Sequence, residues 1–386
     1  MRKITPLVYL ALIASGFVSS CAGRNVHSDI TEKETTLLER KWTLMSREDV
    51  ASDGERGSEH SNSVWFENTL VYGVGEKGLT SLYVGNHEVR WELPILHGVQ
   101  SQILLDRSTV YFGGGDGFLY SVNAETGRVN WRYSLHNPII SKPAIKSGRL
   151  FITASDDSIY AFDAGTGKWL WHYRRRAASS ATILGASQPL VDGNEVIAGL
   201  SDGYIVSLGV DDGALKWEKK LHDGKKFTDV DAHPVIDEGV LYVPSYDGTL
   251  NALRRANHES IWKMDSGASH AVVVEGANLF YPSSDGTIYS LAKTTGKVNW
   301  KFDLDNGIPT ELAVTETYVF VGSSYRYFYM LDKSSGVLLG RYDAGYGSGF
   351  NSSPVWDTER KRVYVLSGGG NLYAFQVATL TPKRLK

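Results

Sequence analysis

The sequence predicts an all-β fold, an eight-bladed β-propeller whose ring is closed by a strand from the N-terminal side. A unit that ends in Trp recurs about every 40 residues. Within each unit apolar residues alternate with a period of two, as in strands, and Asp-Gly and Thr-Gly pairs mark tight turns between the runs. One unit of four short strands cannot bury its own faces, so the units must pack together in a ring.

The unit is clearest in residues 155–173, SDDSIYAFDAGTGKWLWHY, where a polar turn, an alternating strand, a second turn and an outer strand follow one another. Related copies cover residues 115–131, 201–217, 245–262 and 284–300, and a degenerate copy covers 323–340. The closing residues are Trp91, Trp131, Trp171, Trp217, Trp262, Trp300 and, in the degenerate copy, Gly340. A stacking platform for a flat cofactor is one interpretation of these Trp residues. Because they recur once per unit, we predict instead that they are structural anchors between neighbouring blades.

The repeats place seven blades at about residues 60–95, 100–135, 140–176, 186–221, 231–266, 268–304 and 308–344. After residue 351 the chain has three strands and lacks a fourth. A lone strand at residues 37–45 carries Trp42 at the expected position, so we predict that it completes the eighth blade and hides the open strand edges. The propeller then spans residues 37–377, and residues 378–386 form a basic tail.

The N-terminal segment has the pattern of a lipoprotein signal. Residues 1–20 contain Arg2 and Lys3 followed by an apolar run, and small residues lead to Cys21, the only cysteine in the chain. An ordinary secretory signal with a chance cysteine is the alternative. We favour lipidation of Cys21, because the single cysteine lies where a lipoprotein needs it. Residues 21–36 then form a polar, flexible tether.

Composition and motifs exclude several classes of function. The formal net charge of −3 gives no reason to expect nucleic acid as a partner. The sequence contains no H-E-x-x-H, no G-x-S-x-G and no phosphate-binding loop, so we expect no catalytic residues. Four Asp residues belong to the repeated turns and are expected to be turn residues rather than metal ligands: Asp116, Asp202, Asp247 and Asp285.

Two connections between blades are longer than the others. The segments from Trp171 to Pro189 and from Trp217 to Pro234 exceed the repeat template by about six residues each. Since both insertions occupy the same place in adjacent blades, they must emerge side by side on one face. They combine a basic run at 174–176 with apolar residues and aspartates, a composition typical of a protein-docking patch. A pair of ordinary long loops is the alternative.

The segment T-G-K-x-x-W, best preserved in residues 163–171 and 293–300, resembles the tryptophan-docking repeat of the pyrroloquinoline-quinone (PQQ) propeller superfamily. The dehydrogenases of that group are larger and have a vicinal disulfide, calcium ligands and a catalytic Asp. A single cysteine cannot form that disulfide, so the resemblance extends to the fold and does not imply the cofactor. We expect no cofactor.

The lipoprotein signal, the eight repeats and the two long loops together resemble the BamB family of the outer-membrane β-barrel assembly (BAM) machinery. Residues 227–234, FTDVDAHP, resemble the acidic D-V-D loop with which that family binds the barrel protein BamA, so Asp229 and Asp231 carry over. Residues 180–189 resemble its second docking loop, with Ala181 and Ile183 at two Leu positions and Leu184 at an Arg position. The missing Arg departs from the family pattern, and the nearby basic run offers charges instead.

This resemblance implies a non-enzymatic scaffold, anchored through Cys21 to the outer membrane and facing the periplasm; Ala22 after the Cys fits that sorting. Its expected partners are a BamA-type barrel protein and unfolded outer-membrane protein clients. Two alternatives remain: a small PQQ-dependent dehydrogenase-like quinoprotein, and a propeller lipoprotein that serves another envelope complex.

Overall fold

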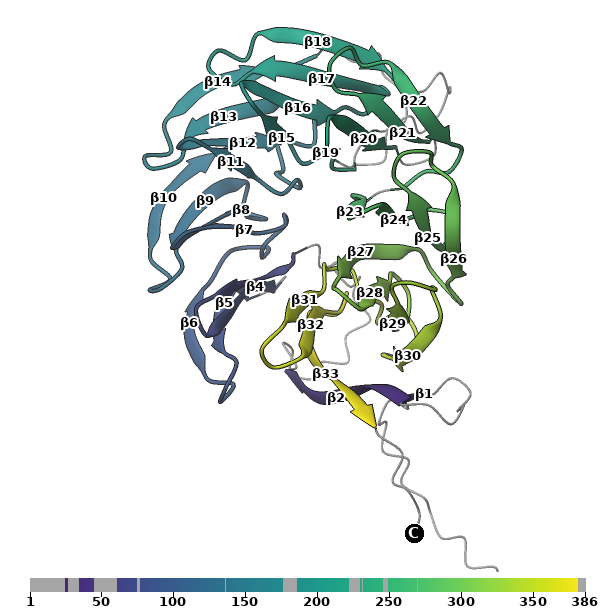
Figure 1. Ribbon diagram of the computed structural model, residues 1–386. Helices are drawn as coiled ribbons and strands as arrows, with labels where there is room; N and C mark the ends of the chain where they lie inside the picture. Colours follow the sequence, from purple (N-terminus) through teal and green to yellow (C-terminus); the bar gives the residue numbers. More distant parts are fainter. Residues whose placement is uncertain are drawn as a thin grey trace, which may run out of the picture.

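The computed structural model describes residues 25–26, 35–44, 61–74, 77–135, 137–175, 186–221, 230, 232–245, 249–268 and 270–380. In these ranges the regular structure consists of strands, and no helix is of the length and apolarity needed to cross a membrane. The strands form eight sheets arranged as blades around a central axis (Figure 1). The predicted all-β propeller with eight blades is confirmed.

The first four blades each contain four antiparallel strands in sequence order. Blade 1 contains β3 (Ser63–Phe66), β4 (Thr69–Val74), β5 (Gly78–Tyr83) and β6 (Val89–Leu93). Blade 2 contains β7 (Leu104–Asp106), β8 (Thr109–Gly113), β9 (Phe118–Asn123) and β10 (Val129–Ser134). Blade 3 contains β11 (Ala144–Lys146), β12 (Arg149–Thr153), β13 (Ile159–Asp163) and β14 (Trp169–Tyr173). Blade 4 contains β15 (Leu190–Asp192), β16 (Glu195–Gly199), β17 (Tyr204–Gly209) and β18 (Leu215–Lys220).

The other four blades repeat this order until the ring closes. Blade 5 contains β19 (Val235–Asp237), β20 (Val240–Pro244), β21 (Leu250–Arg254) and β22 (Ser260–Met264). Blade 6 contains β23 (Val273–Glu275), β24 (Asn278–Pro282), β25 (Thr287–Ala292) and β26 (Val298–Asp303). Blade 7 contains β27 (Pro309–Val314), β28 (Tyr318–Ser323), β29 (Tyr327–Asp332) and β30 (Leu338–Asp343), with β1 (Asn25–Val26) on its outer edge. Blade 8 contains β31 (Val355–Asp357), β32 (Arg362–Leu366), β33 (Leu372–Leu380) and β2 (Thr35–Leu44).

The predicted closing strand is confirmed. β2 pairs antiparallel with β33, from Thr35 opposite Leu380 to Leu44 opposite Leu372, and Figure 1 shows the two strands side by side in purple and yellow. Leu38 of β2 is buried in the cluster that joins blades 7 and 8. A strand from the N-terminal part of the chain and the last strand therefore belong to one sheet, and the outer edge of β33 is covered by β2.

The Trp residues anchor neighbouring blades to each other, as predicted. Trp131 of blade 2 lies against Gly167 of blade 3, whose φ is +71°, so that a Cβ at Gly167 would be 2.5 Å from Cδ2 of the indole. The indole Nε1 donates a hydrogen bond of 2.9 Å to the carbonyl oxygen of Ala164. The same ring-on-glycine contact recurs in four further pairs: Trp91 with Gly127, Trp171 with Gly213, Trp262 with Gly296 and Trp300 with Gly336. The glycine turn between the third and fourth strands is thus also the receiving surface for the Trp of the preceding blade.

Two histidines replace the receiving glycine. His87 and His258 have φ of +64° and +60°, and their rings lie 4.5 Å from Trp42 and 3.9 Å from Trp217, measured between ring centroids. The histidines keep the left-handed backbone and supply an aromatic face for the indole.

Gly340, at the position of the missing Trp, has a different cause. In the next blade, blade 8, the outer strand is β2, which is not joined to β33 by a hairpin. No Thr-Gly turn is therefore present there to receive an indole. Leu38 fills the space, and a Cβ at Gly340 would lie 3.2 Å from the Cβ of Leu38. The degenerate repeat is therefore the place where the ring closes.

Candidate docking face

Connections that lead from the outer strand of one blade to the inner strand of the next lie at the same end of the strands as the turns between second and third strands. Asn137, in the connection between blades 2 and 3, donates a 2.8 Å hydrogen bond to Asp156 in the β12–β13 turn. Arg175, which follows β14, forms a 2.7 Å ion pair with Asp202 in the β16–β17 turn. We call this side of the ring the connector face. The two long connections belong to it.

Most residues that the sequence proposed for function lie outside the described ranges: Cys21, Ala181, Ile183, Leu184, Asp229 and Asp231. The bases of both long connections are described. They comprise residues 174–175 and 186–189 for the first connection and 221, 230 and 232–234 for the second.

Val230, the central residue of the D-V-D motif, is fully buried in the ring. Its amide donates a 3.1 Å hydrogen bond to the carbonyl oxygen of Leu200. Its carbonyl oxygen and side chain occupy the space beside Gly199, where a Cβ would lie 2.0 Å from that oxygen and 2.4 Å from Cγ1. Equivalent apolar residues fill this position in other blades, for example Ile139 beside Gly113 and Phe350 beside Gly322. Val230 therefore fixes the end of the second long connection to the body of the protein.

The bases of the two long connections are bonded to each other. The Ser187 hydroxyl donates a 3.1 Å hydrogen bond to the carbonyl oxygen of Ala232. Nδ1 of His233 lies 3.0 Å from the carbonyl oxygen of Gln188 and must donate, because that oxygen can only accept. Burial lowers the pKa of His233, which favours the neutral ring with its proton on Nδ1. The prediction that the two connections are neighbours on one face is thus met at their bases.

The basic run at the start of the first connection is engaged within the chain. Arg174 lies 3.6 Å from Asp156. Arg175 forms ion pairs with Asp202 and Glu218, and its guanidinium carbon lies 3.9 Å from the centre of the Tyr204 ring. A cation held by two carboxylates and an aromatic face is well fixed. Arg175 therefore attaches the connection to blade 4.

Side chains from three blades meet at the ring axis, at or just before the inner strands. Glu311 of blade 7 accepts a 2.5 Å hydrogen bond from Nε2 of Gln102 in blade 2, and a second from the hydroxyl of Ser353 in blade 8. Blades 2 and 7 are not neighbours, so the contact between Gln102 and Glu311 crosses the axis. A hydrogen bond between side chains of blades 2 and 7 thus crosses the axial region, where a dehydrogenase-type interpretation would place a cofactor.

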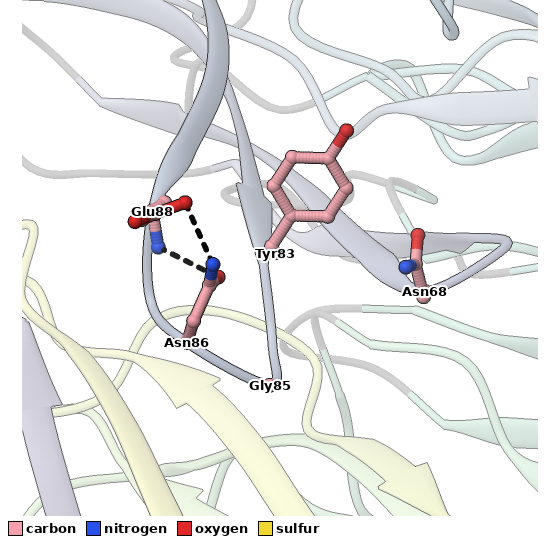
Figure 2. Close-up of a pocket in the computed structure, with 5 residues that line it drawn as sticks. All are labelled: Asn68, Tyr83, Gly85, Asn86 and Glu88. Atoms are coloured by element: carbon pink, nitrogen blue, oxygen red, sulfur yellow. Dashed lines mark hydrogen bonds between the residues drawn. The ribbon is translucent and has the colours of Figure 1, made fainter.

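A hollow of about 300 Å³ lies at the other end of the strands, on blade 1 (Figure 2). Asn68, Tyr83, Gly85, Asn86 and Glu88 line it. Nδ2 of Asn86 donates a 2.7 Å hydrogen bond to Glu88, and the amide of Glu88 bonds back to the Asn86 side chain. These polar groups satisfy one another in an ordinary turn. Among the described residues, no group of three His, Cys, Asp or Glu side chains is placed to hold a metal ion.

Comparison with protein families finds a match to the model described as outer membrane protein assembly factor BamB, over residues 88–302 and 284–383. A protein of that name from Legionella pneumophila (strain Paris) is 27% identical over 208 residues, which cover 52% of this chain and 53% of the relative. The aligned part therefore spans about half the length of that relative.

Solved structures show the same fold. BamB from Moraxella catarrhalis superposes with a TM-score of 0.73 at 19% identity, covering 88% of this chain and 100% of the other. A europium-containing methanol dehydrogenase superposes with a TM-score of 0.70 at 11% identity, covering 88% and 93%. BamB and a dehydrogenase share this propeller, so the fold alone does not decide the function.

Proposed function

Because the chain belongs to the family of the outer membrane protein assembly factor BamB, we propose that it is a non-enzymatic scaffold of the β-barrel assembly machinery whose connector face binds a barrel protein of the BamA type. The single observation that carries the docking role is the shared base of the two long connections. Ser187 is bonded to Ala232 and Gln188 to His233, so both connections leave the ring from one fixed place. Loops held by a rigid scaffold are the usual carriers of binding function.

In this proposal Asp229 and Asp231 provide the acidic contact, and they flank the buried Val230 in the sequence. Ala181, Ile183 and Leu184 provide the apolar contact from the first connection. Arg174 and Arg175 hold that connection to blades 3 and 4 rather than replacing the missing partner-binding Arg. The contact with the barrel protein is therefore mainly apolar on one side and acidic on the other.

The proposal includes a lipid anchor on Cys21, which would place the protein on the outer membrane with its body in the periplasm. Its further partners would be unfolded outer-membrane proteins on their way into the membrane. Two observations support the scaffold role over that of a quinoprotein dehydrogenase: the single cysteine cannot form the vicinal disulfide of those enzymes, and Gln102 and Glu311 meet across the ring axis. Service in another envelope complex remains an outcome that the partner experiment distinguishes.

The test is co-purification of the tagged, lipidated protein from its own membranes after crosslinking, with partners identified by mass spectrometry. The wild type should retain a BamA-type barrel protein, and the Asp229→Ala/Asp231→Ala variant should lose most of it. Asp265→Ala is the matched control, because this exposed acid follows β22 on the same face. Retention by the double variant, or recovery of a different envelope complex, would contradict the proposal.

A further inference from the structure

Blade 7 carries two exposed tyrosines where other blades carry turn residues. Its β28–β29 turn contains Tyr325 and Arg326 in place of Asp-Gly, and the connection after β30 carries Tyr346 between two glycines. Tyr325 is 43% exposed and Tyr346 is 71% exposed. The two rings are in edge contact, with centroids 6.1 Å apart and planes at 70°. Both segments lie on the connector face.

The backbone under Tyr325 is fixed by close packing against both flanking connections. A Cβ at Gly349 would lie 2.1 Å from the carbonyl oxygen of Ser324, and a Cβ at Gly307 would lie 3.0 Å from the Cβ of Tyr325. The amide of Ser324 donates a 2.9 Å hydrogen bond to the carbonyl oxygen of Ile308. The exposed ring is thus presented by a rigid support, which lowers the entropy lost when a partner binds.

The charges in this cluster cancel one another. The guanidinium of Arg326 lies 4.0 Å from the centre of the Tyr346 ring and makes two hydrogen bonds to Asp343, of 2.8 and 2.5 Å. Arg341 lies 4.7 Å from the Tyr327 ring centre and is paired with Asp305. A surface of tyrosine rings backed by neutralised guanidinium groups suits an uncharged, aromatic partner better than an acidic or a basic one.

We propose that the surface formed by Tyr325, Arg326 and Tyr346, which we call the tyrosine surface, binds extended aromatic segments of unfolded β-barrel proteins. This inference rests on the proposed function, which supplies the class of client. Strands of outer-membrane barrels alternate apolar and polar residues and are rich in aromatic residues at the membrane interfaces. Blades 5 and 6 separate the tyrosine surface from the two long connections. One chain therefore has room for a barrel partner and a client strand on the same face.

The experiment measures binding of a labelled peptide of about ten residues, in which Phe and Tyr alternate with Thr, to the full mature chain. A second peptide has Ser in place of each aromatic residue. The wild type should bind the aromatic peptide at least about tenfold more tightly than the Ser peptide. Tyr325→Ser/Tyr346→Ser should remove most of this difference, and Tyr346→Phe should preserve it, since the ring rather than the hydroxyl makes the contact.

Val337→Ser is the matched control, because Val337 is 57% exposed on the same blade and lies outside the tyrosine surface. Its binding of the aromatic peptide should equal that of the wild type. Any of three results overturns the proposal: the wild type binds both peptides equally, the double Tyr variant binds the aromatic peptide as the wild type does, or Val337→Ser loses as much binding as the double Tyr variant. The Asp229→Ala/Asp231→Ala variant is tested in parallel by co-purification. If the proposed barrel docking is wrong, this variant still retains the barrel protein, whatever the result of the peptide-binding assay.

Discussion

For the substitution Gly340→Trp, the repeat pattern and the packing of the propeller predict opposite effects on stability. If the repeat alone governed stability, restoring the Trp would act like a consensus substitution and stabilise the protein by about 0.5–2 kcal/mol. The structure predicts the reverse. A Cβ at position 340 already lies 3.2 Å from the Cβ of Leu38, and no glycine turn is available in blade 8 to receive the indole.

We expect Gly340→Trp to destabilise the protein by about 3 kcal/mol, at the upper end for overpacking, because the indole must displace Leu38. For a propeller of this size, that loss of stability lowers Tm by roughly 4 °C. The assay is urea unfolding followed by circular dichroism, together with hydrogen exchange of the β2 amides. Exchange should accelerate in β2 and remain unchanged in β12 and β13. Gly340→Ala is the control and should be nearly neutral, because its single methyl group requires Leu38 to move by only a few tenths of an ångström. A rise in Tm, or stronger protection of β2, would refute the argument.

Three further outcomes follow from the same contacts. Trp131→Ala should cost about 3–5 kcal/mol in urea unfolding, because it removes a ring packed between two blades and its hydrogen bond, whereas Trp169→Ala, 44% exposed, should cost less than about 1 kcal/mol. Gly199→Ala should move the base of the second long connection, since its Cβ would meet the Val230 carbonyl oxygen at 2.0 Å; barrel-protein retention should fall while the far-ultraviolet circular dichroism spectrum is unchanged. The guanidinium facing Asp343 lowers the pKa of that carboxyl, so the ion pair stabilises the fold at pH above about 4 and the stability is lost as pH falls below that value. Asp343→Asn should therefore lower Tm at pH 7 and flatten its decline between pH 4 and pH 2, and an unchanged pH profile would contradict this assignment.

The blade count and the closing strand were predictable from the sequence because both depend on local, repeated signals. The period of the Trp positions gives the number of blades. Trp42 marks β2 as the outer strand of a blade whose other three strands lie near the C-terminal end of the sequence. The role of the Thr-Gly turns was only half predicted. Turn chemistry explains a glycine with φ of +71° at position 167, but the indole that also requires it comes from the preceding blade. Contacts between repeats are invisible to a pattern that is read one repeat at a time.

The candidate docking face shows the same division. Loop length located the two long connections, since an insertion is visible against the repeat template. The sequence assigned the D-V-D segment, which includes Val230, to docking, and the structure shows that Val230 itself is fully buried in the ring. The bonds from Ser187 and His233 to the neighbouring connection depend on how adjacent blades pack, which no spacing along the chain records.

Departures from the repeat differ in whether a neighbouring blade accounts for them. Gly340 departs because Leu38 occupies the space, and His258 departs because its ring meets Trp217. Each of these substitutions is balanced by a buried contact inside the ring. Tyr325 and Tyr346 are different, because their rings contact each other and Arg326 and still leave 43% and 71% of their area open to solvent. A large apolar side chain gains little from folding while it stays exposed. A deviation from the repeat that no internal contact compensates is best explained by a contact with another molecule. The two tyrosines of blade 7 therefore support the proposed binding of a client.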